Sequence, residues 1–324
     1  MKEYNKLSAA FAISLLAIDD QYSYNKGEKA FTNISKYQLK RFLDDKWDEN
    51  FELEKYIKSL KIDWTKGWLS IDDVLLEKPH SQKIEGVYWL YSSKTGKSEL
   101  GLNVTVLAWC DGKQIIPIKF MVYEKDENDK PLQTKNNFAE ESIKYAHKLG
   151  IKPMYVNFDS KYPSNNMLNI LNNFNWTYYT QLPSNRLFND VQLKNRKFHL
   201  LPEEGKLEGV GHKVSVIKHC KRYYVTNAKL TTGNTVSRQQ ILNNYGTRWS
   251  IEEFFRALKQ LCHLKECKSR SIALQRRYIM LTFRAFMMLQ DQKQSSVYEA
   301  KIYFQRKFLG KKLNGNKALR QIAA

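Results

Sequence analysis

The chain has 324 residues, 42% of them hydrophobic, and its 53 Lys and Arg outnumber its 33 Asp and Glu to give a formal charge of +20. This hydrophobic content is enough for a folded core, so the composition excludes a disordered basic tail. The electrostatic field of a positively charged protein attracts polyanions such as DNA, although a ribosomal protein or a membrane-surface protein would carry a similar charge.

The N-terminal region is predicted to begin with a helix that lies inside the protein. An apolar run at 7–18 follows Lys2 and Lys6, but Asp19 and Asp20 stand where a secretory cleavage site needs small residues. The run is also too short to span a bilayer. We therefore expect a buried helix, a cytoplasmic protein and no membrane partner.

The cysteines indicate neither a disulfide framework nor a zinc site. Cys110, Cys220, Cys262 and Cys267 are too few and too irregularly spaced for a secreted scaffold, and no pair has the C-x2-C spacing. A reduced protein is the simpler interpretation.

Residues 36–43 form a basic amphipathic segment with a clear helix start. Ser35 is a good N-cap residue, and the apolar positions of the segment alternate with Lys36, Lys40 and Arg41. Such a helix either enters a DNA major groove, as the second helix of a helix-turn-helix does, or packs as an ordinary structural element. Both interpretations stay open at this point.

From Trp68 the pattern changes to that of β-strands. Side chains alternate along a strand, so Asp72 and Asp73 point to opposite faces and only Asp73 shares its face with apolar neighbours. Only one of these two carboxylates can therefore face a given site.

The next elements follow the order strands, helix, strand. Runs at 102–109 and 114–122 predict a hairpin, 136–149 predicts an amphipathic helix, and 153–158 predicts a strand that leads into Asp159. Open α/β sheets place their sites at the carboxyl ends of strands, which makes Asp159 a candidate site residue. Its alternative role, capping the next helix, is better filled by residues nearer to that helix.

The most informative segment runs from Tyr245 to Lys259. Tyr245, Arg248, Glu252 and Lys259 are offset by three, seven and fourteen residues, and on a continuous helix they fall within a roughly 60° arc. One carboxylate flanked by two cations and a phenol suits a metal-bound phosphodiester. The alternative is a solvated helix face stabilised by charge pairs.

The residue at which this helix begins determines how many of these four side chains lie on one helical face. Ser250 and Glu253 match a capping box, which would begin the helix at Ser250 and place a bend near Gly246. Tyr245 and Arg248 would then reach the site from the preceding turn. The chain beyond the helix continues with a basic tract that suits either a DNA backbone or a solvated helix: Lys265, Lys268, Arg270, Arg276 and Arg277.

The spacing Y-x2-R-x3-E-x6-K in this segment resembles the signature of bacterial insertion-sequence transposases of the DDE type. Segments 71–79 and 157–162 resemble the first and second aspartate motifs of that family, and the resemblance covers about residues 65–290. It implies an α/β fold, with a ribonuclease H-like mixed sheet flanked by helices. In such transposases three acidic residues hold divalent metal, which implies two Mg²⁺ ions here, with Mn²⁺ as a substitute.

The resemblance also implies roles for individual residues. The family motif reads Asp-Asp-Thr and uses its second aspartate, which selects Asp73 with Asp159 and Glu252 as catalytic metal ligands; Asp72 is the alternative, and Val74 stands where Thr is usual. The other residues of the signature, Tyr245, Arg248 and Lys259, are expected to bind DNA phosphates. Some transposases of this type place a tryptophan near the final strand of the insertion to stack on a flipped base; here Arg222, Tyr223 and Tyr224 occupy that neighbourhood, which leaves stacking by a tyrosine open.

The predicted organisation is an N-terminal helical region at 1–64 that binds DNA, followed by a catalytic domain at 65–324. This domain has a β-rich insertion at about 175–226, where aromatic and polar positions alternate between turns, and a basic helical C-terminal part. The expected partners are terminal-repeat and target DNA and a second copy of the chain, in the nucleoid. Two alternatives remain, a non-catalytic DNA-binding protein derived from a transposase and a nuclease without strand transfer.

Overall fold

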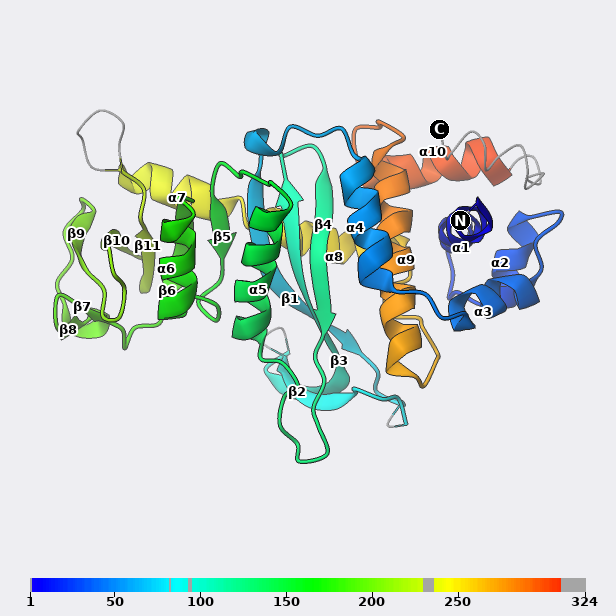
Figure 1. Ribbon diagram of the computed structural model, residues 1–324, viewed down its shortest axis with the longest axis horizontal. Helices are drawn as coiled ribbons and strands as arrows, with labels where there is room; N and C mark the ends of the chain where they lie inside the picture. Colours follow the sequence, from blue (N-terminus) through cyan, green and yellow to red (C-terminus); the bar gives the residue numbers. More distant parts are fainter. Residues whose placement is uncertain (1, 82, 93–94, 230–235, 310–324) are drawn as a thin grey trace. The chain divides into compact units, whose positions relative to one another are not determined.

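The computed structural model describes residues 2–81, 83–92, 95–229 and 236–309. These residues form an α/β fold with a mixed nine-stranded sheet flanked by helices, so the predicted fold class is confirmed (Figure 1). The strand order is β2-β3-β1-β5-β6-β11-β10-β9, with β4 paired to β3, and a separate small sheet contains β7 and β8.

The strands have the following bounds: β1 (Trp68–Glu77), β2 (Tyr88–Ser92), β3 (Lys97–Cys110), β4 (Ile115–Val122), β5 (Val156–Phe158), β6 (Tyr178–Leu182), β7 (Leu187–Phe188), β8 (Val191–Gln192), β9 (Glu203–Lys206), β10 (Lys213–His219) and β11 (Arg222–Thr226). The α-helices are α1 (Lys2–Leu16), α2 (Tyr24–Gly27), α3 (Lys36–Asp44), α4 (Glu49–Ser59), α5 (Lys135–Lys148), α6 (Asn165–Asn173), α7 (Arg238–Gly246), α8 (Trp249–Leu261), α9 (Ile272–Gln290) and α10 (Val297–Leu309). Short 3-10 helices lie at Glu28–Ala30, Trp64–Lys66 and Leu193–Asn195.

The chain forms two compact units. Unit 1 contains the chain up to Lys58, Val74–Val104 and the chain from Glu253 onward, and unit 2 contains Ser59–Asp73 and Thr105–Glu252. The strands β1 and β3 and the helix α8 each contribute residues to both units. The N-terminal helices belong to the same unit as the C-terminal ones. The boundary predicted after residue 64 stays a prediction.

In unit 1, the apolar N-terminal run forms a buried helix, as predicted. Side chains at 10–16 of α1 are fully inaccessible, and this helix packs against α3 and α9. Ser35 caps α3 through a capping box with Gln38, which confirms the predicted helix start. None of the described helices is both long and apolar enough to cross a membrane.

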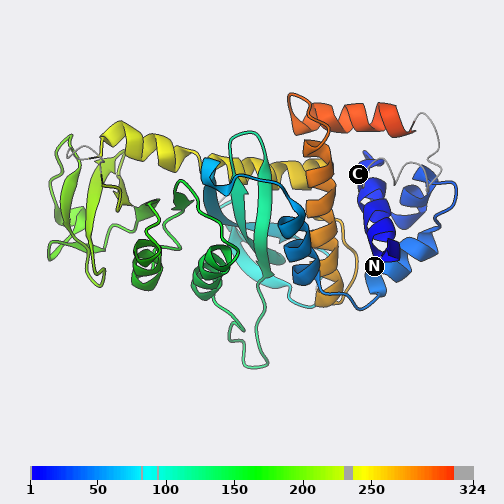
Figure 2. The same ribbon diagram turned by 45° about the horizontal axis from the view of Figure 1, so that its top comes forward.

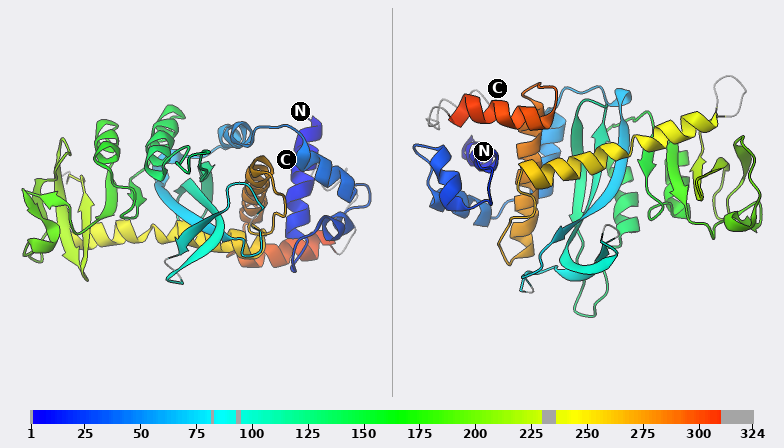
Figure 3. Two further views of the ribbon diagram at one scale, coloured as in Figure 1. Left: turned by 90° about the horizontal axis from the view of Figure 1, so that it is seen from below. Right: turned by 180° about the vertical axis from the view of Figure 1, so that it is seen from behind.

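In unit 2, β5 pairs in parallel with both β1 and β6, and these strands carry the candidate site. The helices α5 and α6 lie side by side, as Figure 2 shows, and α7 contacts β5, β6 and β11. The left panel of Figure 3 shows α7 on the opposite side of these strands from α5 and α6. The predicted helix at 136–149 and the predicted strand at 153–158 are both present, with slightly different ends.

The predicted β-rich segment supplies strands that extend the large sheet. From β6 onward, β11, β10 and β9 are added in antiparallel pairing. Tyr223 and Tyr224 of β11 expose only 4% and 7% of their surface. Tyr224 packs in a core cluster with Tyr155 and Tyr179. These tyrosines are therefore core residues, and stacking on a flipped base by either ring is not supported.

Candidate active site

The two adjacent aspartates of β1 point to opposite faces of the strand, as the alternation predicts. On the face of Asp72, Ser70 Oγ donates a hydrogen bond to Asn157 Oδ1 at 2.5 Å, and Asn157 Nδ2 donates to Thr247 Oγ1 at 2.8 Å. Thr247 lies between α7 and α8. The face that carries Asp72 is therefore the face on which the α7–α8 turn is seated.

Arg248, in that turn, joins two carboxylates. Its Nη1 donates to Asp72 Oδ2 at 2.6 Å, and its Nη2 donates to Glu252 Oε1, four residues further along. The side chains of Arg248 and Asp72 are only 17% and 13% exposed, so this ion pair is largely shielded from water. Burial by itself lowers the pKa of the Arg248 guanidinium, but the two carboxylates outweigh it and raise that pKa overall.

Asp72 is buried more deeply than an isolated carboxylate tolerates. The pKa of its carboxyl is raised to about 6, mainly by burial and also by the charges of Asp73 and Asp159, while the attraction of Arg248 opposes this increase. Asp159 follows β5 directly, and its Oδ1 accepts a hydrogen bond from the backbone N–H of Lys161 at 2.6 Å. Because Ile71 of β1 is paired in register with Phe158 of β5, Asp72 and Asp159 are the next residues on the two adjacent strands.

Asp73 has a different set of partners. Its Oδ1 accepts a hydrogen bond from Tyr162 Oη at 3.0 Å, its Oδ2 accepts one from Lys135 Nζ at 2.8 Å, and Lys161 Nζ lies 3.8 Å from Oδ1. Tyr162 is fully buried, and burial together with the charge of Asp73 holds the pKa of its phenol well above the ordinary value. Tyr162 is thus a packing residue that binds Asp73, and two lysines neutralise that carboxylate.

The helix start predicted at Ser250 is wrong. The helix is interrupted after Gly246, where α7 ends, but α8 begins at Trp249 and places Ser250 inside the helix. Ser250 Oγ is buried and has no hydrogen-bond partner among the described residues, so it forms no capping box. The physical reason is that backbone hydrogen bonds begin before Ser250: the Ser250 N–H donates to Thr247 O and the Ile251 N–H donates to Arg248 O, both at 3.1 Å. Ser250 therefore does not stand at the N-cap, the position from which its side chain would accept from the Glu253 N–H.

Tyr245 accordingly lies on α7 and not on the helix of Glu252. Its ring contacts the Tyr224 ring edge-on, with centroids 5.0 Å apart, and the Arg248 guanidinium lies 5.8 Å from its centre. Burial raises the pKa of the Tyr245 phenol, and Arg248 opposes this increase. In this position the ring supports Arg248 by packing.

Lys259 belongs to the part of α8 that lies in unit 1. Its Nζ donates to the backbone oxygen of Leu75 at 2.8 Å and lies 3.7 Å from Glu77 Oε1. The amine therefore ties α8 to β1, and 22% of the Lys259 side chain stays exposed.

The acidic residues have the donor chemistry of a hard-cation site. Carboxylate oxygens suit Mg²⁺ and Mn²⁺. The described ranges contain no group of three or more His, Cys, Asp or Glu side chains already arranged to hold a metal ion. The guanidinium of Arg248 bridges Asp72 and Glu252 instead.

Residues 64–288 match the transposase DDE domain family. The chain belongs to this family of transposases. No curated protein matches the chain significantly. The matched range contains every acidic and basic residue of the candidate site, and it confirms the broader resemblance to DDE transposases. The narrower resemblance, to transposases with the Y-x2-R-x3-E-x6-K signature, stays a prediction.

The transposase contains site neighbours that the sequence did not reveal. Lys135 and Lys161 neutralise Asp73 and come from the start of α5 and from the loop after β5. Lys161 lies inside the segment that resembles the second aspartate motif, but its pairing with Asp73 was not predicted, and nothing in the local pattern of Lys135 distinguishes it from other surface lysines. Both pairings depend on the fold bringing these segments to β1.

The raised pKa of Asp72 has a consequence for the stability of the transposase. An unfolded Asp titrates near pH 4, so between about pH 4 and about pH 6 the folded protein binds an extra proton at Asp72, and the stability from this group falls as the pH rises. The Asp72→Asn variant lacks this titration. Urea unfolding across pH 4–7 is expected to show its stability relative to wild type increasing by about 3 kcal/mol. A difference that stays constant across this range would contradict the assignment.

Proposed function

We propose that this transposase cleaves DNA at the ends of an insertion sequence and joins those ends to target DNA, with divalent metal. The observation that carries the proposal is the link from Asp72 through Arg248 to Glu252. It joins carboxylates from β1 and α8, and the first step alone spans 176 residues of sequence. In a chain of the DDE transposase family, such convergence of acidic side chains supports a catalytic site.

We assign the first metal-binding position to Asp72 rather than to Asp73. Asp72 shares its face of β1 with the α7–α8 turn and is linked to Glu252, while Asp73 is bound by Tyr162 and Lys135. Asp72, Asp159 and Glu252 would then hold the Mg²⁺ ions, or Mn²⁺ in their place. The bound metal would supply Lewis-acid stabilisation of the developing charge at the phosphodiester.

The basic residues would position the DNA. Arg248 presents a planar fork that matches a phosphate as well as the carboxylates it binds, and Lys259 would act as a point charge beside another phosphate. Tyr245 would contribute by supporting Arg248. In the N-terminal region, Lys40 and Arg41 of α3 are exposed and Lys36 is partly exposed, which is compatible with contact to the terminal repeats.

The strand-transfer step follows from the same chemistry. After cleavage, the liberated 3′-hydroxyl would attack a phosphodiester of the target, so that one ester bond forms as another breaks and no outside energy source is needed. Pairing of two DNA ends favours a homodimer in the assembled complex.

The proposal is tested by incubating the protein with Mg²⁺, a target plasmid and labelled DNA that carries the sequences flanking its coding region. Products in which the labelled end is covalently joined to the plasmid are expected. Cleaved ends without joined products would indicate a nuclease, and retarded but intact DNA would indicate a non-catalytic binding protein. Either of these two outcomes would overturn the proposed transposition activity.

A further inference from the structure

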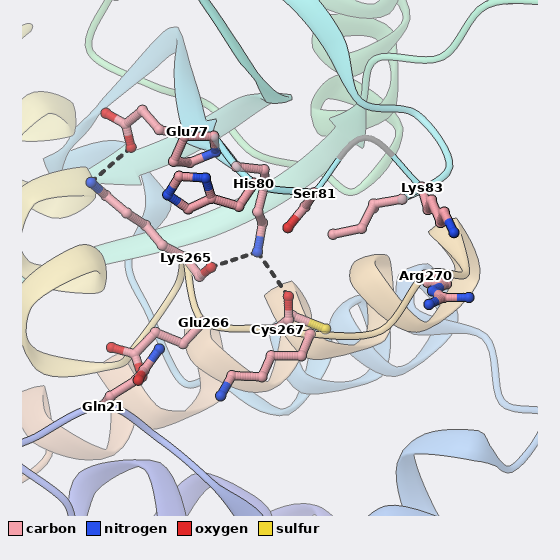
Figure 4. A pocket seen from close by; sticks show the side chains of 13 residues that line it. Gln21, Glu77, His80, Ser81, Lys83, Lys265, Glu266, Cys267 and Arg270 are labelled. Atoms are coloured by element: carbon pink, nitrogen blue, oxygen red, sulfur yellow. Dashed lines mark hydrogen bonds and ion pairs between the residues drawn. The ribbon is translucent and has the colours of Figure 1, made fainter.

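Unit 1 contains a large polar cleft that the proposed catalytic residues do not use. It lies between the end of β1 with the residues that follow it and the segment after α8, and its volume is about 860 Å³. Figure 4 shows side chains from both segments, among them Glu77, His80, Lys265 and Arg270, lining this cleft. This volume lies in the range of sites that hold an organic ligand and is larger than a single inorganic ion needs.

The acidic groups of the cleft already have cationic or N–H partners. Glu77 is paired with Lys265 at 2.7 Å and with Lys259 at 3.7 Å. Glu266 accepts hydrogen bonds from the His263 ring at 2.9 Å and from the Tyr22 backbone N–H. These two carboxylates therefore do little to neutralise the remaining cations of the cleft.

A buried ammonium lies in the wall of the cleft. Lys78 is only 6% exposed, and its Nζ donates to the backbone oxygens of Lys265 at 2.5 Å and Cys267 at 2.8 Å. Figure 4 draws these bonds as dashed lines, together with the ion pair between Glu77 and Lys265. Both partners are neutral, and burial lowers the pKa of the amine. An anion in the cleft would offset the desolvation of this charge, because opposite charges interact strongly where water is excluded.

Three further cations and one histidine are exposed around the same cleft. Lys83 and His80 follow β1, and Lys268 and Arg270 follow α8. Within the described part of the chain, no ion pair joins Lys83, Lys268 or Arg270 to a carboxylate. Positive charge is thus spread along two segments, which favours a ligand with several phosphates over a single anion.

We infer that this cleft binds the phosphodiester backbone of DNA. The identity of the polyanion rests on the proposed function, whereas the charge and shape of the cleft do not. Lys83, Lys268 and Arg270 contact phosphates directly, and Lys78 adds attraction from the wall. Such contacts carry no base specificity, so they add affinity for DNA of any sequence.

The test compares two triple variants that remove the same number of charges. One variant carries Lys83→Gln, Lys268→Gln and Arg270→Gln. The control carries Lys144→Gln, Lys148→Gln and Lys152→Gln, which are exposed lysines of α5 and the loop after it. Fluorescence anisotropy with labelled random-sequence DNA, as duplex and as single strand, gives the affinity between about 50 and about 200 mM salt in EDTA.

The cleft variant is expected to bind about 10- to 100-fold more weakly at the lowest salt, and its salt slope should fall by two to three counterions for duplex DNA, about 0.9 for each lost phosphate contact. The salt slope of the control variant should fall by less than about one counterion. A cleft variant that behaves like the control with both DNA forms overturns the inference. A second variant, Lys83→Arg with Lys268→Arg, retains charge and should bind like wild type if charge, and not folding, is what the first variant loses.

Binding in EDTA also separates this inference from the proposed function. A protein that fails to cleave or join DNA but shows the cleft-dependent salt slope would contradict transposition while supporting the cleft. A protein that joins DNA, but whose cleft variant keeps the wild-type salt slope, would support transposition and contradict DNA binding by the cleft.

Discussion

Replacing Glu252 with Gln is expected to abolish Mg²⁺-dependent strand cleavage while DNA binding is retained. The carboxylate is proposed to bind metal, and a neutral amide is a much weaker ligand for a hard divalent cation. Loss of several kcal/mol of transition-state stabilisation corresponds to a decrease in cleavage rate of at least about 10³-fold. The fold should persist, since Gln keeps an oxygen that can accept the hydrogen bond from Arg248. The rate is measured on a labelled end substrate, and binding is measured in EDTA.

The neighbouring residue offers a matched control for this experiment. Glu253 is exposed and lies about 100° further around α8. Glu253→Gln removes the same charge from the same helix and should cleave at nearly the wild-type rate. Equal rates for Glu252→Gln and wild type would remove Glu252 from the proposed site, and equal losses in both variants would point to a general effect of charge or folding.

The second large effect is expected at Asp72 and not at Asp73. Asp72→Asn should lower metal-dependent cleavage by at least about 10³-fold, because it removes a proposed metal ligand that faces the α7–α8 turn. Binding of Mn²⁺, followed by calorimetry or by electron paramagnetic resonance, should weaken in parallel. The stability of this variant at neutral pH should be equal to or greater than that of wild type, since a buried charge has been removed.

The Asp73→Asn variant should show the opposite pattern. Asp73 accepts from Tyr162 and Lys135, so loss of its charge should cost about 1–3 kcal/mol of folding stability. Cleavage should stay close to the wild-type rate, because the side chain of Asp73 lies on the opposite face of β1 from the proposed ligand Asp72 and its carboxylate binds these other partners. If Asp73→Asn abolishes Mn²⁺ binding and Asp72→Asn does not, then the second aspartate holds the metal, as the family motif had suggested.

The choice between these two aspartates shows how far a sequence pattern can go. Alternation along β1 correctly predicted that the two carboxylates face opposite ways, because that follows from backbone geometry alone. Which face looks toward the α7–α8 turn depends on Ser70, Asn157 and Thr247 meeting across the unit, and these residues are distant in the sequence. The family motif favoured Asp73, whereas the packing favours Asp72.

The helix around Glu252 gives a second example. Local rules predicted a change in the helix near Gly246, where α7 ends, but they also predicted a capping box at Ser250 that does not form. The backbone hydrogen bonds of the turn begin before Ser250, through Thr247 O and Arg248 O, so Ser250 does not stand at the N-cap and its side chain has no capping role. Likewise, the exposure of Tyr223 and Tyr224 could not be predicted from alternation, because it depends on what covers each face of β11.

The sequence by itself determined the elements of this protein whose cause is local: the buried N-terminal helix, the Ser35 cap, the order of strands and helices, and the acidic and basic residue types available for chemistry. Hydrophobic periodicity and capping act within a few residues, so they are written in the chain directly. Only the tertiary structure decided which of those residues meet. The pairing of Asp72 with Arg248, the burial of Tyr162 against Asp73, and the gathering of cations around the cleft all depend on long-range packing, in which burial and charge pairing act between segments that no local pattern connects.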